Sequence, residues 1–298
     1  MISICIPIYN FDVKELVKAL EIEIKQNKLP VNLILIDDFS DKKYKELNKP
    51  ICQKHTYIEL ESNIGRARIR NLFLKYTSSP YLLFLDCDSK IKSSSFITTY
   101  LKYTNNAKVV CGGRVYPKEK PSKNKMLSWQ YGVKQESKTA QERSKEPNSS
   151  FMTNNFLIKR KILDQIKFEE NLSQYGHEDT LFGFALAQKK IKVLHIENPV
   201  LNGDIEDNVA FLHKTEQGIE NLVIILKLID YNQEFIQNVK LLDFYYQLKQ
   251  KRLLFVLKTE KILLPFIKKR LEKGNVNLKA FNLYKLMYLN RCFGQKTL

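Results

Sequence analysis

The stretch Leu82-Leu83-Phe84-Leu85-Asp86-Cys87-Asp88 is an apolar run that ends abruptly in two carboxylates one residue apart. A short, continuous apolar run is typical of a strand buried on both faces of a sheet. Because alternate residues of a strand share a face, Asp86 and Asp88 can point the same way, with Cys87 turned aside. Two neighbouring carboxylates repel each other unless a cation lies between them. The motif therefore indicates a Mg²⁺ or Mn²⁺ site, with a simple surface turn as the alternative.

Short apolar strands alternate with amphipathic helices on either side of this run. Strands are predicted at 2–6, 31–37, 56–60, 80–85 and 107–112, and helices at 12–27, 41–54 and 64–76. This alternation predicts an α/β fold with a Rossmann-like, mostly parallel sheet flanked by helices. In such sheets ligands bind beyond the carboxyl ends of the strands, near a switch in strand order.

The second half of the chain is less regular. We expect a mobile polar loop at 113–150 around a short helix near 126–133, then a strand at 151–158, a helix at 159–166, a polar loop at 167–177, a helix at 178–189 and a strand at 191–196. From about residue 206 the pattern is helical to the end. The sequence thus predicts an α/β domain at 1–205 and a helical C-terminal region at 206–298.

Charge and cysteine content narrow the class of protein. The net charge of +17 indicates an anionic partner, such as a nucleotide, a nucleic acid or an acidic membrane surface. Nucleic acid is disfavoured, because no RNA- or DNA-binding signature accompanies the basic residues. The five cysteines form no Cys-x-x-Cys pair, which favours reduced thiols over disulfides or a zinc site. With no signal-peptide pattern and no apolar run near the roughly 18 residues of a membrane span, we expect a cytoplasmic protein.

Polar residues also follow the first two predicted strands, at the same edge of the sheet. In Pro7-Ile8-Tyr9-Asn10, the ring of Tyr9 can stack on a base or pack in a turn. In Asp37-Asp38-Phe39-Ser40-Asp41, one carboxylate can accept hydrogen bonds from a nucleobase or a ribose, while Ser40 and Asp41 can cap the next helix. Both motifs are consistent with a nucleotide-binding edge.

The helix predicted at 64–76 begins at this edge as well. Asn63 is a candidate cap for it, and Gly65 allows a ligand to approach its first turn. Arg66 and Arg70 are four residues apart and share a face, and arginine suits bidentate contacts with phosphate. The alternative is a solvated basic face, but a helix N-terminus beside the carboxylates favours an anion site.

Glu178 and Asp179 open the helix predicted at 178–189, directly after Gly176-His177. Two carboxylates in a first turn stabilise a helix through its dipole, which is the structural interpretation. The functional interpretation is a general base with a neighbour that orients an acceptor hydroxyl.

The order of these motifs resembles the family 2 glycosyltransferases of the GT-A fold. The resemblance covers residues 1 to about 200, and Thr153-Asn154-Asn155-Phe156 is similar to the family's acceptor-side strand. It implies a metal-dependent, inverting transfer of a sugar from a nucleotide-sugar, most often a UDP-sugar, to a glycan or lipid-linked acceptor in surface polysaccharide assembly. The residues implied to bind the nucleotide-sugar are Pro7, Tyr9, Asn10, Asp37, Asp38, Asn63, Gly65, Arg66, Arg70, Asp86, Cys87, Asn154 and Asn155.

The resemblance also implies the roles of the acidic residues. Asp88 would bind Mn²⁺ or Mg²⁺, with Asp86 on the ribose or the ion. Asp179 would be the base and Glu178 would contact the acceptor. Similar proteins often carry a metal-binding histidine where this chain has Asn202. The third ligand is therefore open between Asn202 and a water, and a catalytically inactive binding module is the alternative function.

The C-terminal region contains a segment, 253–270, that mixes apolar and basic residues at helical spacing. One interpretation is a peripheral contact with the anionic inner face of a membrane, close to a lipid-linked acceptor. The alternative is an appended helical bundle whose basic face is solvated.

Overall fold

The computed structural model describes residues 1–172 and 175–295 of the chain, so the loop predicted at 167–177 is described only in part. These residues form two compact units, which are treated separately. The α/β unit comprises 1–117, 136–172 and 178–204, and the helical unit comprises 118–135, 175–177 and 205–295.

The α/β unit is built on a seven-stranded sheet with the strand order β3-β2-β1-β4-β8-β6-β9. The strands are β1 (Ile2–Ile8), β2 (Val31–Asp37), β3 (Thr56–Glu59), β4 (Tyr81–Leu85), β6 (Val109–Cys111), β8 (Asn155–Lys159) and β9 (Leu194–His195). Only β8 runs antiparallel to its neighbours, β4 and β6. The predicted mostly parallel α/β sheet is therefore confirmed.

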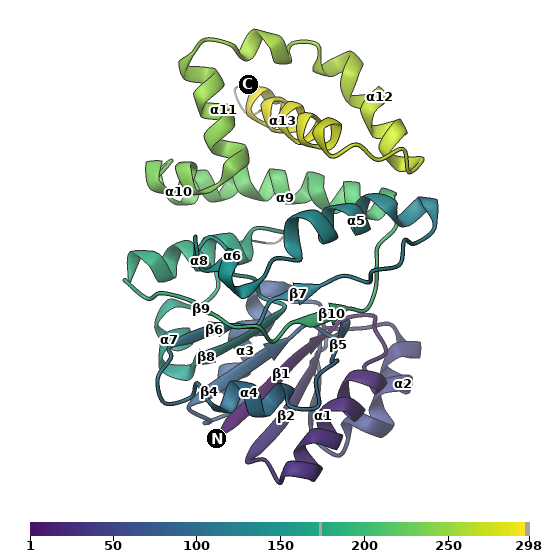
Figure 1. Ribbon diagram of the computed structural model, residues 1–298, viewed down its shortest axis with the longest axis vertical. Helices are drawn as coiled ribbons and strands as arrows, with labels where there is room; N and C mark the ends of the chain where they lie inside the picture. The colour runs from purple at the N-terminus through teal and green to yellow at the C-terminus, as the bar shows by residue number, and fades with distance from the viewer. Residues whose placement is uncertain (173–174, 296–298) are drawn as a thin grey trace. The chain divides into compact units, whose positions relative to one another are not determined.

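Helices cover both faces of this sheet (Figure 1). One face packs against α1 (Lys14–Asn27), α2 (Lys42–Cys52) and α4 (Phe96–Leu101), and the other against α3 (Arg66–Tyr76), α7 (Arg160–Ile166) and α8 (Glu178–Gln188). Side chains of one strand alternate between the two cores: Leu83 and Leu85 of β4 join the first, and Leu82 and Phe84 the second. Burial on both faces explains why β4 is continuously apolar.

The strand order reverses between β1 and β4, because β2 and β3 extend the sheet from β1 in one direction and β4 extends it in the other. The two strands are parallel, so their carboxyl ends lie side by side. A reversal of this kind leaves a crevice at the carboxyl edge, where ligands bind in open α/β sheets. The segments Tyr9-Asn10 and Asp86-Cys87-Asp88 both follow these two strand ends.

A second, three-stranded sheet was not predicted. Its strands are β5 (Ser89–Lys90), β10 (Val200–Asn202) and β7 (Arg114–Val115), in the order β5-β10-β7. Strands of two or three residues are too short to show a period in the sequence. For the same reason the strand expected at 191–196 is reduced to β9, and the one expected at 151–158 begins only at Asn155.

The short helix predicted near 126–133 is confirmed, but the prediction that the rest of 113–150 is a plain loop was wrong. The segment holds β7, η1 (Lys123–Lys125), α5 (Met126–Tyr131), the π-helical turn η2 (Gly132–Glu136) and α6 (Ala140–Arg143). Arg143 is buried and donates hydrogen bonds to the backbone oxygens of Gly112 and Ile196, at 3.1 and 2.8 Å. The hydrogen bonds of Arg143 to distant backbone atoms hold this segment in place. Contacts of this kind produce no periodic pattern in the sequence, so they could not be predicted from it.

The helical unit confirms the prediction of helices beyond residue 206. They are α9 (Asn208–Leu228), α10 (Gln233–Asn238), α11 (Lys240–Gln250), η3 (Leu254–Leu257), α12 (Glu260–Glu272) and α13 (Leu278–Gln295). The buried amide of Asn208 bonds to the backbone of Leu127, Lys123 and Glu272, which ties α5 and α12 to the start of α9. Among the described residues, no helix has both the length and the apolar character needed to cross a membrane.

Replacement of Gly112 by alanine should destabilise the α/β unit. A Cβ atom there would lie 2.5 Å from both the Asn155 Nδ2 atom and the backbone oxygen of Asn198. Because backbone atoms cannot swing away, we expect a loss of about 1–3 kcal/mol in the free energy of unfolding. The control is Gly294→Ala in α13, where nothing lies within 4 Å of the new Cβ and alanine favours the helix. Thermal unfolding of both variants measures this, and equal melting temperatures would contradict the prediction.

Candidate active site

Asp86, the first residue after β4, contacts two arginines of α3. Its Oδ1 atom accepts a hydrogen bond from Arg70 Nη2 at 2.9 Å, and its Oδ2 atom lies 3.5 Å from Arg66 Nη2. The Asp86 N–H donates to the backbone oxygen of Asn154 at 3.0 Å, which fixes the start of the turn. The first carboxylate of the Asp86-x-Asp88 motif is therefore bound to cationic side chains of the chain itself.

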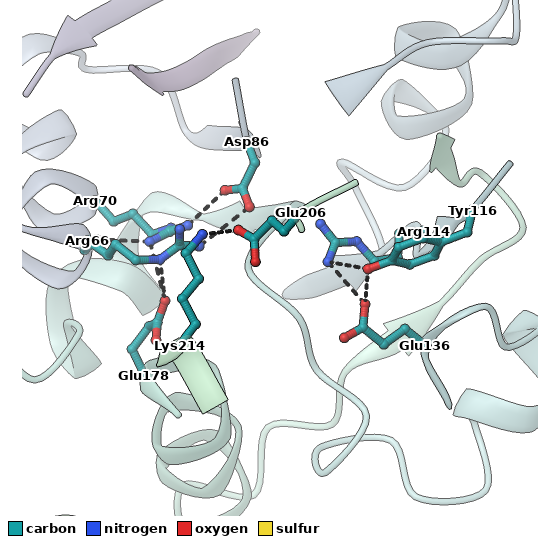
Figure 2. Close-up of polar contacts among 9 residues, drawn as sticks. All are labelled: Arg66, Arg70, Asp86, Arg114, Tyr116, Glu136, Glu178, Glu206 and Lys214. Carbon is teal, nitrogen blue, oxygen red and sulfur yellow. Dashed lines mark hydrogen bonds and ion pairs between the residues drawn. The ribbon is translucent and has the colours of Figure 1, made fainter. Parts of the chain in front are cut away.

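Glu178, at the start of α8, contacts the same arginines from a distant part of the sequence. Its Oε1 atom accepts a hydrogen bond from Arg66 Nε at 2.7 Å and lies 4.0 Å from Arg70 Nη1. Figure 2 shows both arginines between the carboxylates of Asp86 and Glu178. We call these four residues the arginine–carboxylate cluster. The prediction that Arg66 and Arg70 share a helix face is confirmed, and Arg66 is the more exposed of the two.

The two acidic pairs, Asp86/Asp88 and Glu178/Asp179, each contain carboxyl groups with opposite pKa shifts. Burial would raise the pKa of Asp86 and Glu178, but the charges of Arg66 and Arg70 outweigh it and hold both values below the usual range. Burial raises the pKa of Asp88 to about 6, and the charge of Asp86 adds to the effect. Burial and the charge of Glu178 likewise raise the pKa of Asp179 to about 6. Such a separation equips neighbouring carboxyls for different chemical roles.

Asp88 lies in the wall of a pocket of about 380 Å³. The pocket is also lined by Asp12 and Glu15 before and within α1, and by Gly203 and Asp204 after β10. No group of three or more His, Cys, Asp or Glu side chains suited to a metal was found in the described parts of the chain. A metal held by Asp88 would therefore need oxygen atoms from a ligand or from water, which is common for Mg²⁺.

Asn202 ends β10 beside the Asp88 segment. It pairs with Ser89 of β5, and the next residue, Gly203, donates its N–H to the backbone oxygen of Asp88 at 2.9 Å. The Asn202 side chain is buried, and its Nδ2 atom donates to the backbone oxygen of Asp204 at 3.3 Å. The position singled out in the sequence is thus adjacent to Asp88, while its role as a ligand stays a prediction.

Arg114 is a charged residue near the site that the sequence analysis missed. Its Nη1 atom lies 3.1 Å from Glu136 Oε2, and the hydroxyl of Tyr116 donates to that same oxygen at 2.6 Å (Figure 2). The charge of Arg114 opposes the burial that raises the pKa of Asp88, and it adds to the charges of Arg66 and Arg70 that hold the pKa of Asp86 down. Its Nε atom is buried and has no hydrogen-bond partner among the described residues. The available signal was an arginine directly after Gly112-Gly113 at a strand end.

Two exposed aromatic rings, Tyr9 and Phe39, follow β1 and β2, and both remain about half exposed. The loops that carry them are joined by two hydrogen bonds: Asn10 N donates to Ser40 Oγ at 2.8 Å, and Asp41 N donates to Asn10 Oδ1 at 2.7 Å. These two hydrogen bonds hold the backbones of the two loops together next to Tyr9 and Phe39.

Asp37 and Asp38 both accept hydrogen bonds from the backbone, but Asp37 uses only one of its oxygens. Asp37 is fully buried; its Oδ1 atom accepts a hydrogen bond from Ser40 N at 2.7 Å, and its Oδ2 atom has no partner among the described residues. Asp38 accepts hydrogen bonds from Ile64 N and Gly65 N at 2.7 and 3.1 Å, so a carboxylate of the chain already occupies the N-terminus of α3. The expected Asn63 cap is not formed. Gly65 is the N-cap, and Asn63 donates to the Asp38 backbone at 3.1 Å.

The remaining candidate residues differ in whether their side chains have hydrogen-bond partners within the protein. Asn155 is fully buried, and its amide bonds to the Tyr100 hydroxyl and to the backbone oxygens of Gly113 and Asn198. The amide of Asn154 is also buried, but neither its oxygen nor its nitrogen has a partner among the described residues. Pro7 lies within β1, and Cys87 is half-buried against the core beside it. Asn154 is therefore the better placed of the two asparagines to contact a ligand.

Comparison with solved structures identifies the fold. The first 349 residues of TarS from S. aureus, in complex with UDP-GlcNAc, match with a TM-score of 0.52 and 15% identity over 98% of this chain and 92% of theirs. A mannosyltransferase from Pyrobaculum calidifontis, solved with GDP-Man and Mn²⁺, gives a TM-score of 0.54 and 12% identity over 76% of this chain and 64% of its own. Glucosyl-3-phosphoglycerate synthase from Mycobacterium tuberculosis, with UDP and Mn²⁺, gives 0.52 and 13% over 75% and 77%. The fold is that of the GT-A glycosyltransferases.

Sequence comparison supplies the family. The teichoic acid poly(glycerol phosphate) polymerase of Staphylococcus epidermidis is 31% identical over 109 residues, which is 35% of this chain but only 15% of that relative. Residues 3–167 match the sequence profile of glycosyl transferase family 2. Since this match spans more than half of the chain, the protein belongs to glycosyl transferase family 2.

Proposed function

We propose that this protein transfers a sugar from a nucleotide-sugar, with a UDP-sugar as the first candidate, to a hydroxyl group of a glycan or lipid-linked acceptor. The observation that carries the proposal is the arginine–carboxylate cluster, in which Arg66 contacts both Asp86 and Glu178 and so brings the pairs Asp86/Asp88 and Glu178/Asp179 to one place. The opposite pKa shifts within each pair support it. TarS binds UDP-GlcNAc and the curated relative is a teichoic acid polymerase, which supports a role in surface polysaccharide assembly. The five cysteines are free thiols, which is consistent with a protein that acts in the cytoplasm, where thiols stay reduced.

The donor would bind in the crevice beyond β1 and β4. Tyr9 offers an exposed ring for the base, and Arg66, which is 42% exposed, offers a guanidinium to the diphosphate. The unpartnered amide of Asn154 is placed to bond to the sugar or ribose. Asp38, Asn63 and Gly65 would act mainly by shaping the loops that the base and ribose meet, because their polar groups are engaged within the chain. Asn155 would in the same way hold the backbone of Gly113. Asp37 keeps one buried carboxylate oxygen without a partner among the described residues, and this oxygen could accept a hydrogen bond from the base or ribose.

A divalent cation, Mn²⁺ or Mg²⁺, fits the residues at the end of β4. Asp88 is half-buried beside Asp86, and desolvation together with the charge of Asp86 raises its pKa to about 6, so its negative charge is not fully balanced by the protein. Asp88 would hold the ion, with Asp86 and the Asn202 side chain as further oxygen donors. When bound, the ion would neutralise charge on the leaving diphosphate. Two of the structural relatives were solved with Mn²⁺.

Asp179 would act as the general base. It would take the proton of the acceptor hydroxyl as that oxygen forms a bond to the anomeric carbon. The bond from this carbon to the diphosphate oxygen breaks in the same step, and the nucleoside diphosphate leaves with the electron pair, stabilised by Arg66. A single displacement inverts the anomeric configuration. Glu178 would remain ionised between the arginines and keep the start of α8 in position.

Thermal stabilisation by UDP, GDP and their sugars, with Mn²⁺ or with a chelator, tests the donor site. We expect stabilisation by one nucleotide-sugar that requires the metal. Asp88→Ala should weaken this metal-dependent binding by at least roughly 10- to 100-fold, because loss of a residue that only supports a metal ligand already has an effect of this size. The control Asp12→Ala removes another carboxylate of the same pocket and should preserve it. An unchanged donor affinity in Asp88→Ala would exclude Asp88 as a ligand.

Asp179→Asn should nearly abolish transfer and leave nucleotide binding intact. Loss of a general base slows a reaction by roughly 10²–10⁴-fold. The variant should also be as stable as the wild type or more stable at pH 7.5, because a carboxyl whose folded pKa is raised destabilises the fold once ionised. Rate and melting temperature are measured together. Transfer at the wild-type rate would refute the assignment, and nucleotide binding without transfer in the wild type would identify a binding module.

Transfer should depend on pH through Asp179. The base must be ionised, and burial beside Glu178 raises its pKa to about 6. We therefore expect kcat/KM for the acceptor to fall about tenfold per pH unit below this value and to level off about one unit above it. The residual kcat/KM of Asp179→Asn should not show this fall at low pH. A wild-type profile that stays flat from pH 5 to pH 8 would contradict the role of Asp179.

A further inference from the structure

The η3–α12 segment of the helical unit exposes large apolar side chains close together in the sequence. Phe255 and Phe266 are each 59% exposed, Val256 is 52% exposed and Ile262 is 78% exposed. Exposed apolar side chains that gather on one surface usually mark a binding site for a protein or a membrane. The opposite face of α12 is buried through Leu264, Ile267 and Leu271 within the same unit, so α12 has one face packed and one apolar face left over.

Basic residues surround these apolar side chains. Residues 251–270 contain seven lysines and arginines and a single acidic residue, Glu260, which accepts a hydrogen bond from Asn290. Lys268 is paired with Glu216 at 2.8 Å, but Lys258, Lys261 and Lys269 form no ion pair within the described residues and are exposed. The surface thus combines apolar tips with positive charge that the chain does not neutralise.

The spacing places both kinds of residue on the same side of α12. Ile262 and Phe266 are four residues apart, and Lys269 follows three residues later, so all three share a face. Arg270 lies over the ring of Phe266, with its guanidinium carbon 5.8 Å from the ring centre. Long basic side chains beside apolar ones can keep their charges at lipid headgroups while the apolar tips enter the acyl region.

We propose that the η3–α12 surface, formed by Phe255, Val256, Ile262, Phe266 and the surrounding lysines, docks onto an anionic lipid bilayer. Negatively charged headgroups match the positive charge, and the acyl chains accept Ile262 and Val256, aliphatic side chains that offer no stacking face to a nucleic acid. Docking would hold the protein at the inner membrane surface. That this brings it to a lipid-linked acceptor rests on the proposed function, whereas the docking itself does not.

The full-length protein is sedimented with vesicles of phosphatidylcholine containing 30% phosphatidylglycerol, and with vesicles of phosphatidylcholine alone. We expect binding to the anionic vesicles that weakens as salt rises. Ile262→Glu with Phe266→Glu should reduce partitioning at least about tenfold, because both apolar tips are lost. The control is Ile22→Glu in α1, an aliphatic side chain of the α/β unit that is 56% exposed, and this variant should bind like the wild type.

A second pair of variants tests how much the positive charge contributes to vesicle binding, apart from the apolar side chains. Replacing Lys258, Lys261 and Lys269 with alanine should weaken binding by roughly tenfold to a hundredfold, whereas the same change at three exposed lysines of the α/β unit, Lys54, Lys92 and Lys108, should not. Melting temperatures confirm that each variant is folded.

Three results would overturn the proposal: no binding of the wild type to anionic vesicles at low salt, equal binding to both kinds of vesicle, or wild-type binding by the Ile262→Glu, Phe266→Glu variant. Salt-sensitive binding of RNA in place of vesicles would reassign the surface. Stabilisation by a nucleotide-sugar is measured on the same variants and should not change. If no nucleotide-sugar stabilised the wild-type protein, that result would instead count against the proposed function.

Discussion

The arginine–carboxylate cluster is the interaction on which the candidate site depends. Arg66 and Arg70 on α3 hold Asp86 at the end of β4 and Glu178 at the start of α8, so three separate segments, one of them more than a hundred residues from the arginines in sequence, meet at two guanidinium groups. The Arg70 side chain is only 2% exposed and the Glu178 side chain 8%. Loss of either would leave a partner charge buried without compensation, which is far more unfavourable than loss of a surface ion pair.

The same cluster explains why adjacent carboxyls behave differently. Two arginines balance Asp86 and Glu178, whereas the next acidic residue of each motif lies in buried surroundings beside a like charge. The fold therefore keeps Asp88 and Asp179 ionised only at some expense of stability. Such an arrangement is unfavourable in a purely structural region, and it suits groups that bind a cation or accept a proton in catalysis.

The sequence predicted much of this, because the relevant signals are local. Alternating apolar strands and amphipathic helices predicted the mostly parallel sheet, and polar residues after β1, β2 and β4 predicted which edge of the sheet carries the candidate site. The four-residue spacing of Arg66 and Arg70 predicted a shared face. The Asn63 cap was not predicted correctly, because Asp38, which is distant in sequence, bonds to the N–H groups at the start of α3.

Composition and spacing thus determined the sheet, the edge where ligands would bind, and the acidic and basic residue types available there. Only the tertiary structure decided how these residues are partnered. In the folded protein Asp86 and Glu178 form ion pairs with the arginines. The amide of Asn154 is buried without a partner among the described residues, and Arg114 lies near the candidate site because it is part of the β5-β10-β7 sheet. The physical reason is that secondary structure follows the periodicity of neighbouring residues, whereas the pKa of a carboxyl depends on burial and on charges that arrive from distant segments.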